Sequence, residues 1–161
     1  MDAKVDKTLK ITTPSELEIV MTRMFDAPRH LVFDAMTKPE HLKRWFSCEQ
    51  APLRICEIDL RVGGAYRFVM SSPGGECTLQ GIYREISRPE LVVFTERFSM
   101  PGFTGSEYRV ATTFEDIGGR TRMTTSILHS TKEARDGHLA GIDQGVSSAY
   151  DRLAAFLESQ A

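Results

Sequence analysis

The sequence has few cysteines, a single tryptophan and no long run of apolar residues. Its three cysteines, Cys48, Cys56 and Cys77, form no CxxC pair, and an odd number without an export signal favours reduced thiols over disulfides. No apolar segment approaches the ~20 residues that cross a bilayer, and residues 1–13 lack the charged-then-apolar order of a signal peptide. We therefore expect a cytoplasmic protein that is not inserted in a membrane.

The chain also lacks an excess of charge of either sign. It carries 20 Lys and Arg against 22 Asp and Glu, and no block of like charges forms a tail. Nucleic acids and anionic membranes attract basic patches, so neither is an expected partner. At 161 residues the chain fits one domain, which we expect over residues 15–160, with residues 1–14 as a tail or a short extra edge strand.

Signatures of metal, nucleotide and nucleophile sites are missing too. The four histidines are scattered along the chain, at His30, His41, His129 and His138. No group of histidines or cysteines has metal-ligand spacing, so no metal is expected. No GxSxG turn presents a nucleophile, and the glycine pairs at 74–75 and 118–119 belong to hairpin turns instead of opening a helix after a strand. No cofactor is expected either.

What the sequence does contain is alternation of apolar and polar residues, which is typical of half-buried strands. The alternation begins in residues 15–22 and returns in five or six short runs between residues 54 and 128. Turn residues separate the runs, so neighbouring strands are antiparallel; these turns lie at 63–64, 73–75 and 118–119. Gly81, inside one run, is a candidate bulge that bends the sheet.

Two short helices and one long helix complete the pattern. Asp26 is a candidate N-cap for a helix that ends near Thr37, and Thr37 with Glu40 has capping-box spacing for a second short helix. An apolar stripe with helical period between Leu139 and Leu157 predicts the long helix. A curved antiparallel sheet around one long helix is an α+β fold. The space between its sheet and helix suits a small molecule.

Several segments of the chain resemble a known family. They are FDAP at 25–28, PEHL leading to WF at 39–46, GGAYRFVM at 63–70 and GIYREI at 81–86. They resemble bacterial proteins akin to the C-terminal domain of the activator of Hsp90 ATPase, within the START-like (SRPBCC, Bet v 1-like) helix-grip superfamily. The resemblance implies a hydrophobic cavity between the sheet and the C-terminal helix. It also implies an Hsp90-type chaperone as a possible partner.

The residues expected to line this cavity come from the second short helix, the strands and the long helix. They are Trp45, Phe46, Phe68, Met70, Phe94, Glu96, Tyr108, Val110, Phe114, Met123, Ile142, Val146 and Tyr150. The strand positions depend on parity, because a shift of one residue moves a side chain to the other face. By the same parity the outer face carries five arginines, Arg54, Arg67, Arg84, Arg97 and Arg109.

Glu96 and Tyr108 are the acid and the hydroxyl that this pattern places together on an inward face. If the loop near Gly102 closes a regular hairpin, Glu96 lies directly across from Tyr108. A desolvated carboxyl can act as a general acid or base beside a tyrosine that orients a carbonyl, so the pair is a candidate for catalysis. In the plainer interpretation it is a cross-strand hydrogen bond near the rim of the sheet.

Three functional hypotheses follow from these patterns and from the resemblance. The first, which the lack of evident reacting groups favours, is the binding of a small, largely apolar molecule in the cavity. The second is an interaction protein that modulates an Hsp90-type chaperone ATPase. The third is a cyclase or hydrolase that acts on a natural product through Glu96. A homodimer that pairs through a sheet edge is compatible with each of them.

Overall fold

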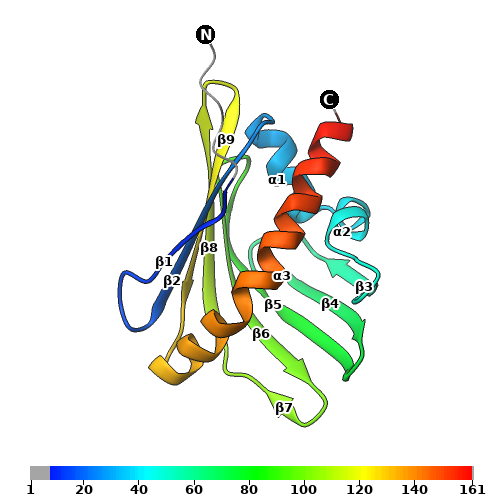
Figure 1. The fold of residues 1–161 in the computed structure, drawn as a ribbon. Coiled ribbons are helices and arrows are strands. Elements are labelled where there is room, and N and C mark those ends of the chain that lie inside the picture. The colour runs from blue at the N-terminus through cyan, green and yellow to red at the C-terminus, as the bar shows by residue number, and fades with distance from the viewer. Residues whose placement is uncertain (1–7, 161) are drawn as a thin grey trace.

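The structure is a computed structural model that describes residues 8–160, apart from the side chains of residues 143 and 144 (Figure 1). Two short helices follow the second strand, and one long helix ends the chain. The elements in chain order are β1 Lys10–Thr12, β2 Glu18–Phe25, α1 Arg29–Thr37, α2 Pro39–Trp45, β3 Leu53–Ile58, β4 Ala65–Ser72, β5 Gly75–Ser87, β6 Leu91–Met100, β7 Phe103–Thr104, β8 Tyr108–Ile117, β9 Arg120–Leu128 and α3 Lys132–Ser159.

The nine described strands form one antiparallel sheet in the order β1-β2-β9-β8-β6-β5-β4-β3, with β7 paired to the end of β6. The long helix α3 lies across the concave face of this sheet, and α1 and α2 lie beside its C-terminal half (Figure 1). The predicted α+β helix-grip fold is therefore confirmed. Within residues 8–160 no helix is long and apolar enough to cross a membrane.

The N-terminal segment contributes one short strand to the edge of the sheet. Strand β1 pairs with β2, with Ile11 opposite Met21. Residues 1–7 of the predicted tail lie outside the described part of the chain. The edge strand extends the sheet by one neighbour beyond β2, on the side away from β9.

Alternating burial along the strands shows which face of the sheet meets α3. On β2, Ile19, Met21 and Phe25 are buried, and on β9 the residues that pair with them, Ile127 and Thr125 among others, are buried as well. Side chains of opposite parity are more accessible, as expected for a sheet with one covered face. The alternation of apolar and polar residues in the sequence thus reflects a sheet with one face covered by α3.

Two arginines fix the position of α3 against the rest of the fold. Near its start, the Arg135 guanidinium donates to the carbonyl oxygens of Ser15 at 2.7 Å and Glu18 at 3.2 Å. Near its end, Arg152 Nε donates to the carbonyl oxygen of Trp45 at 2.9 Å. Because each arginine satisfies backbone acceptors of a distant segment, both halves of the helix are tied to the sheet and to α2.

The helix caps predicted from the sequence are wrong in two places. The N-cap of α1 is Pro28, without a side-chain cap, and the Asp26 carboxylate instead lies 3.5 Å from the Arg120 guanidinium. The Thr37 hydroxyl donates to the carbonyl oxygen of Phe33 at 2.8 Å, so it forms no capping box with Glu40. The Asp26 and Thr37 side chains thus bond to partners other than the backbone N–H groups that begin each helix. The spacing of residue types in the sequence does not reveal such partners.

Gly81 serves the fold in a different way from the bulge predicted for it. The shift in register between β5 and β6 lies between Tyr83 and Glu85. At position 81 a Cβ atom would overlap the carbonyl oxygen of Thr95 and would stand only 3.0 Å from the ring of Tyr66. A residue without a side chain is therefore required, because β6 and the Tyr66 ring both pass through the space that a side chain would fill.

We expect Gly81→Ala to destabilise the fold by about 3 kcal/mol or more, because the overlap with Thr95 involves backbone atoms of a paired strand. Urea unfolding followed by circular dichroism measures this loss. Gly74→Ala is the matched control, since nothing lies within 4 Å of a Cβ at that turn position. Equal effects of the two substitutions would contradict the close approach at Gly81.

Candidate functional site

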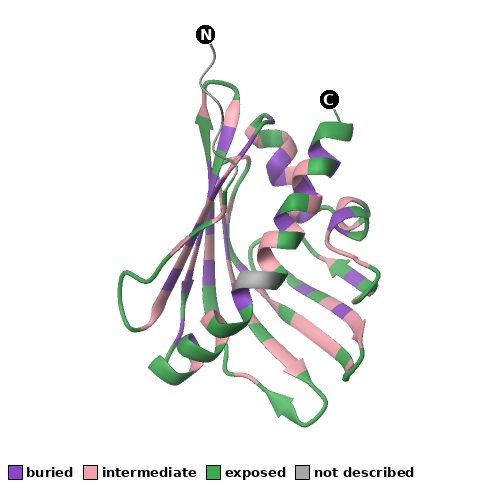
Figure 2. Cartoon of the chain, in the orientation of Figure 1, coloured by how far each residue is buried: buried purple, intermediate pink, exposed green. Residues whose placement is uncertain are grey.

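The concave face of the sheet is covered unevenly by α3 (Figure 2). On β2, β8 and β9 the inward side chains are almost completely buried, as at Ile19, Phe114 and Met123. On β4, β5 and β6 several inward side chains are also buried, as at Tyr66, Tyr83 and Val92. Others on the same face stay partly accessible; they are Phe68, Met70, Leu79, Phe94 and Phe98. An apolar surface that faces the helix but is not fully closed is the geometry of a binding site for an apolar molecule.

Two separate core clusters meet at this partly accessible surface. The larger cluster packs α1, α2 and the C-terminal half of α3 against the sheet, and the smaller one packs Ile142 of α3 against β2, β8 and β9. Phe94 of β6 and Val146 of α3 are half-buried and touch both clusters. The boundary between the clusters is therefore lined by side chains that still have accessible apolar surface.

Glu96 lies one step along β6 from Phe94 on the same face, and it is partly buried. Tyr108 of β8 pairs directly with it, as the sequence predicts, and the Tyr108 hydroxyl donates to Glu96 Oε1 at 2.6 Å. On the other side, the Tyr66 hydroxyl lies 2.8 Å from Glu96 Oε2 and 3.0 Å from the carbonyl oxygen of Thr95. The carboxyl is thus held between two phenol groups.

Tyr66 reaches Glu96 from β4, across the intervening strand β5. It pairs with Gly81 of β5, and the missing side chain there leaves the Tyr66 ring free to extend toward β6. The sequence places Tyr66 on the same face as Phe68 and Met70 but gives no sign that it reaches two strands away. The contact depends on Gly81, whose role a pattern of apolar residues does not reveal.

All four tyrosines of the chain surround this one carboxyl. Burial raises the pKa of each tyrosine, and the negative charge of an ionised Glu96 would raise it further. The tyrosines are Tyr66, Tyr83, Tyr108 and Tyr150, on β4, β5, β8 and α3. Glu96 is therefore surrounded by neutral hydroxyl groups and aromatic edges, and the tyrosines stay protonated at neutral pH.

The pKa of the Glu96 carboxyl is raised, and burial is the main cause. Hydroxyl groups that donate to an ionised carboxylate act against this shift, first that of Tyr108 and then that of Tyr66. Burial and the scarcity of positive charge around the carboxyl favour its neutral form. The site thus combines one polar group with a partly accessible apolar surface, which is the usual make-up of a small-molecule pocket.

The histidines are not all scattered in space, contrary to the sequence-based expectation. His129 Nε2 and His138 Nδ1 are 2.9 Å apart, and both rings lie against the Tyr108 ring with centroids 4.7 and 5.0 Å away. Burial lowers the pKa of His138 to about 4 and lowers that of His129 as well. Among the described residues no group of three or more His, Cys, Asp or Glu could hold a metal ion.

The histidine pair predicts a loss of stability in acid. Between about pH 6.5 and pH 4 the unfolded chain protonates His138 while the folded chain does not, so stability falls as pH falls through this window. His138 alone changes the free energy of unfolding by at most about 1.4 kcal/mol per pH unit. Thermal unfolding of His138→Gln across this window should show a flatter pH profile than the wild type. His30→Gln, at an exposed position of α1, is the control that should leave the slope unchanged.

The other predicted site residues divide into core and accessible positions. Trp45 is buried, and its indole N–H donates to the carbonyl oxygen of Ala35 at 2.8 Å. Four more are core residues of the two clusters, Val110, Phe114, Met123 and Ile142, and Tyr150 is buried with its ring edge against Phe25. Phe46, Phe68, Met70, Phe94 and Val146 keep accessible surface. The five predicted outer-face arginines are all exposed.

Arg23 is an inward polar residue that the sequence analysis did not select. It lies on the covered face of β2 and is buried, with its guanidinium 4.6 Å from the centre of the Phe25 ring. It donates to the Met24 carbonyl oxygen at 3.2 Å and to Asp151 of α3 at 3.1 Å. Its alternation with Met21 and Phe25 marks it as inward, so parity could have identified it.

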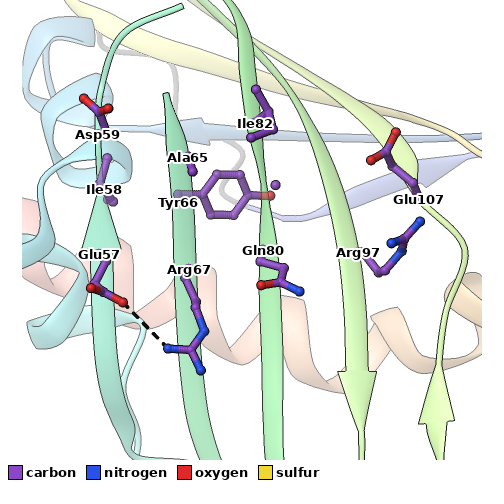
Figure 3. Close-up of a pocket in the computed structure, with 11 residues that line it drawn as sticks. Glu57, Ile58, Asp59, Ala65, Tyr66, Arg67, Gln80, Ile82, Arg97 and Glu107 are labelled. Atoms are coloured by element: carbon purple, nitrogen blue, oxygen red, sulfur yellow. Dashed lines mark ion pairs between the residues drawn. The ribbon is translucent and has the colours of Figure 1, made fainter. Parts of the chain in front are cut away.

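A hollow of about 600 Å³ opens on the opposite, outer face of the sheet (Figure 3). A polar row crosses it from strand to strand, with Arg67 opposite Gln80 and Gln80 opposite Arg97. Arg67 lies 3.7 Å from Glu57, so part of this charge is neutralised within the protein. With exposed charges along much of its lining, the hollow suits an apolar ligand less than the surface around Phe94 does.

Comparison with known families matches residues 26–158 to the model of the activator of Hsp90 ATPase homolog 1-like proteins. This range spans most of the chain and includes every residue of the site around Glu96. A search among proteins of curated function finds no match.

Solved structures of bacterial proteins share the fold over nearly the whole chain. A Rhodobacter sphaeroides protein has a TM-score of 0.86 and 22% identity, covering 96% of this chain and 100% of that one. A Nitrosomonas europaea protein has a TM-score of 0.78 and 25% identity, covering 92% and 98%. A Silicibacter pomeroyi protein of the same family has a TM-score of 0.70 and 21% identity, covering 89% and 99%. At these identities the likeness concerns the fold.

Proposed function

The chain belongs to the family of activator of Hsp90 ATPase homolog 1-like proteins, and on this basis we propose that it binds a small, largely apolar molecule between β4–β6 and α3. The observation that carries the proposal is the partly accessible apolar surface at the boundary of the two core clusters, around Phe94 and Val146. Glu96 and Tyr108 stand beside it as the polar groups that orient the ligand.

The energetics of such a site favour apolar contact with a small polar addition. Covering about 200 Å² of apolar surface contributes about 5 kcal/mol before the cost of immobilising the ligand. That gain alone gives weak binding, so a hydrogen bond to the phenol and carboxyl groups is needed for selectivity. The site offers apolar surface at Phe94 and hydrogen-bonding groups at Glu96 and Tyr108, and Phe94 and Glu96 are neighbours on the same face of β6.

Mass spectrometry of the purified protein, first under native and then under denaturing conditions, tests the proposal directly. A stoichiometric small molecule that is retained in the native spectrum and released on unfolding supports binding and supplies the ligand's mass. The measurement detects a bound molecule whatever its chemical identity. A mass equal to that of the bare chain, together with no binding of apolar probes, would remove the proposal.

Val146→Trp should block the site, because an indole in place of an isopropyl group adds bulk at a half-buried position that packs, like Phe94, against both core clusters. Binding of N-phenyl-1-naphthylamine, followed by its fluorescence, should weaken at least about tenfold. Ser148→Trp adds the same side chain at an exposed position of α3 and should bind the probe like the wild type. Equal probe binding by folded Val146→Trp and wild type would contradict the location of the site.

A second candidate function comes from the family itself, whose description is an activator of the Hsp90 ATPase. In this function the protein contacts an Hsp90-type chaperone and raises its rate of ATP hydrolysis without any small ligand. We expect a steady-state assay with a bacterial Hsp90 to show stimulation that saturates with added protein if this function holds. No change at saturating protein, with a known co-chaperone as positive control, would rule it out.

A further inference from the structure

Three short oxygen–oxygen contacts link Thr95, Tyr66, Glu96 and Tyr108 in one row. Their lengths are 3.0 Å from the Thr95 carbonyl to the Tyr66 hydroxyl, 2.8 Å from there to Glu96, and 2.6 Å from Glu96 to Tyr108. Each hydrogen bond of this kind contains one hydrogen, so the row contains three. The carbonyl supplies none and the two hydroxyls supply one each. The third hydrogen has to come from the Glu96 carboxyl.

An ionised Glu96 would leave the row one hydrogen short. Both hydroxyls would then donate to the carboxylate, and the oxygens of Tyr66 and Thr95 would face each other at 3.0 Å with no hydrogen between them. Tyr66 is buried, so water does not readily replace the missing partner. A buried acceptor without a donor costs about 1–3 kcal/mol. The neutral carboxylic acid satisfies all three contacts at once.

Building on the proposed function, we propose that Glu96 is an uncharged carboxylic acid at neutral pH and that the site binds an apolar alcohol or phenol through the ligand's own hydroxyl hydrogen. The hydrogens of the row run in one direction: Tyr108 donates to Glu96, Glu96 to Tyr66, and Tyr66 to Thr95. All three are used inside the protein, so a ligand finds only lone pairs on the Tyr108 and Glu96 oxygens. A hydroxyl group can donate to these lone pairs, whereas a ketone or an ether cannot.

The neighbouring charges agree with a neutral acid. Arg23 of β2 is occupied by Asp151 and a backbone carbonyl, and His129 and His138 are bonded to each other. Arginines next to the site along β6 and β8 are exposed on the outer face, at Arg97 and Arg109. The groups from β4, β5, β8 and α3 that interact electrostatically with Glu96 are the four tyrosine hydroxyls. Burial among them raises the pKa of the carboxyl.

The direction of two pKa changes tests this arrangement without any ligand. The side-chain carboxyl of Glu96 is followed by carbon NMR in protein labelled with ¹³C-glutamate, and Glu96→Gln identifies its signal. We expect the chemical shift of a neutral acid at pH 7. Tyr66→Phe removes the acceptor of the acid's hydrogen and should lower the Glu96 pKa, whereas Tyr108→Phe removes a donor and should raise it. A rise in both variants, or an ionised shift at pH 7, would overturn the proposal.

Glu96→Gln gives a second readout, because the amide can donate to Tyr66 and accept from Tyr108 as the neutral acid does. The unfolded chain loses the Glu96 proton when the pH rises above the ordinary carboxyl pKa of 4.5. The folded state keeps this proton to a higher pH, because its Glu96 pKa is raised. The stability of the wild type therefore falls as the pH rises from the unfolded-state pKa to the folded-state pKa. Glu96→Gln has no proton to lose at this position, so its stability does not change for this reason. We expect the Tm difference in favour of Glu96→Gln to grow from pH 4 to pH 7. A variant less stable than the wild type at pH 7 would contradict a neutral acid.

Two probes of nearly equal shape test the ligand class, 2-naphthol and its methyl ether 2-methoxynaphthalene. One additional hydrogen bond corresponds to about tenfold tighter binding of the naphthol, measured by calorimetry. Tyr108→Phe should reduce this preference. Equal affinities would overturn recognition through a donated hydrogen while leaving the proposed binding function intact. If neither probe binds, the proposed ligand class fails, the native mass spectrum decides whether the binding function fails with it, and the carbon titration still decides the state of Glu96.

Discussion

The carbonyl oxygen of Thr95 lies where any residue but glycine at position 81 would place its side chain. This close approach of β5 and β6 has two consequences. It interrupts the regular pairing, so that the Ile82 amide donates to the Thr95 hydroxyl at 3.2 Å instead of to a backbone carbonyl. It also opens a path across β5 through which the Tyr66 ring reaches Glu96. The local pairing of β5 with β6 and the composition of the site therefore depend on the same missing side chain.

The site around Glu96 differs from an ordinary surface ion pair in what surrounds the acid. Carboxylates usually lie beside arginine, lysine or water, which favour the charged form. Here the neighbours are phenols on three strands and on α3, and each is itself held neutral by burial. A polar group placed in this way costs stability unless its hydrogen bonds are complete. The completeness of the row from Thr95 to Tyr108 thus explains how the fold tolerates an acid on its covered face.

The sequence predicts features that repeat along the chain and misses those that depend on a single contact. Alternation and turn glycines were enough to place Glu96 opposite Tyr108, because register follows from the pattern of a buried face. The same pattern does not show that Tyr66 crosses β5, since that contact depends on Gly81. His129 and His138 meet because the turn into α3 brings them together, and Asp26 finds Arg120 in place of a helix end. Each of these contacts depends on how separate segments of the chain come together in space, which alternation and turn residues do not show.

The direction in which the accessible apolar side chains face bears on the choice between the two proposed functions. Phe68, Phe94 and Val146 face the space between the sheet and α3 and do not form an outward patch. Each of them keeps only part of its surface accessible, which is little for a protein partner to contact, and Arg135 and Arg152 tie α3 to the backbone of distant segments near both of its ends. A small molecule can reach the same side chains with the helix in place. The apolar surface around Glu96 therefore favours a small ligand, and contact with a chaperone would have to use other surfaces of the fold.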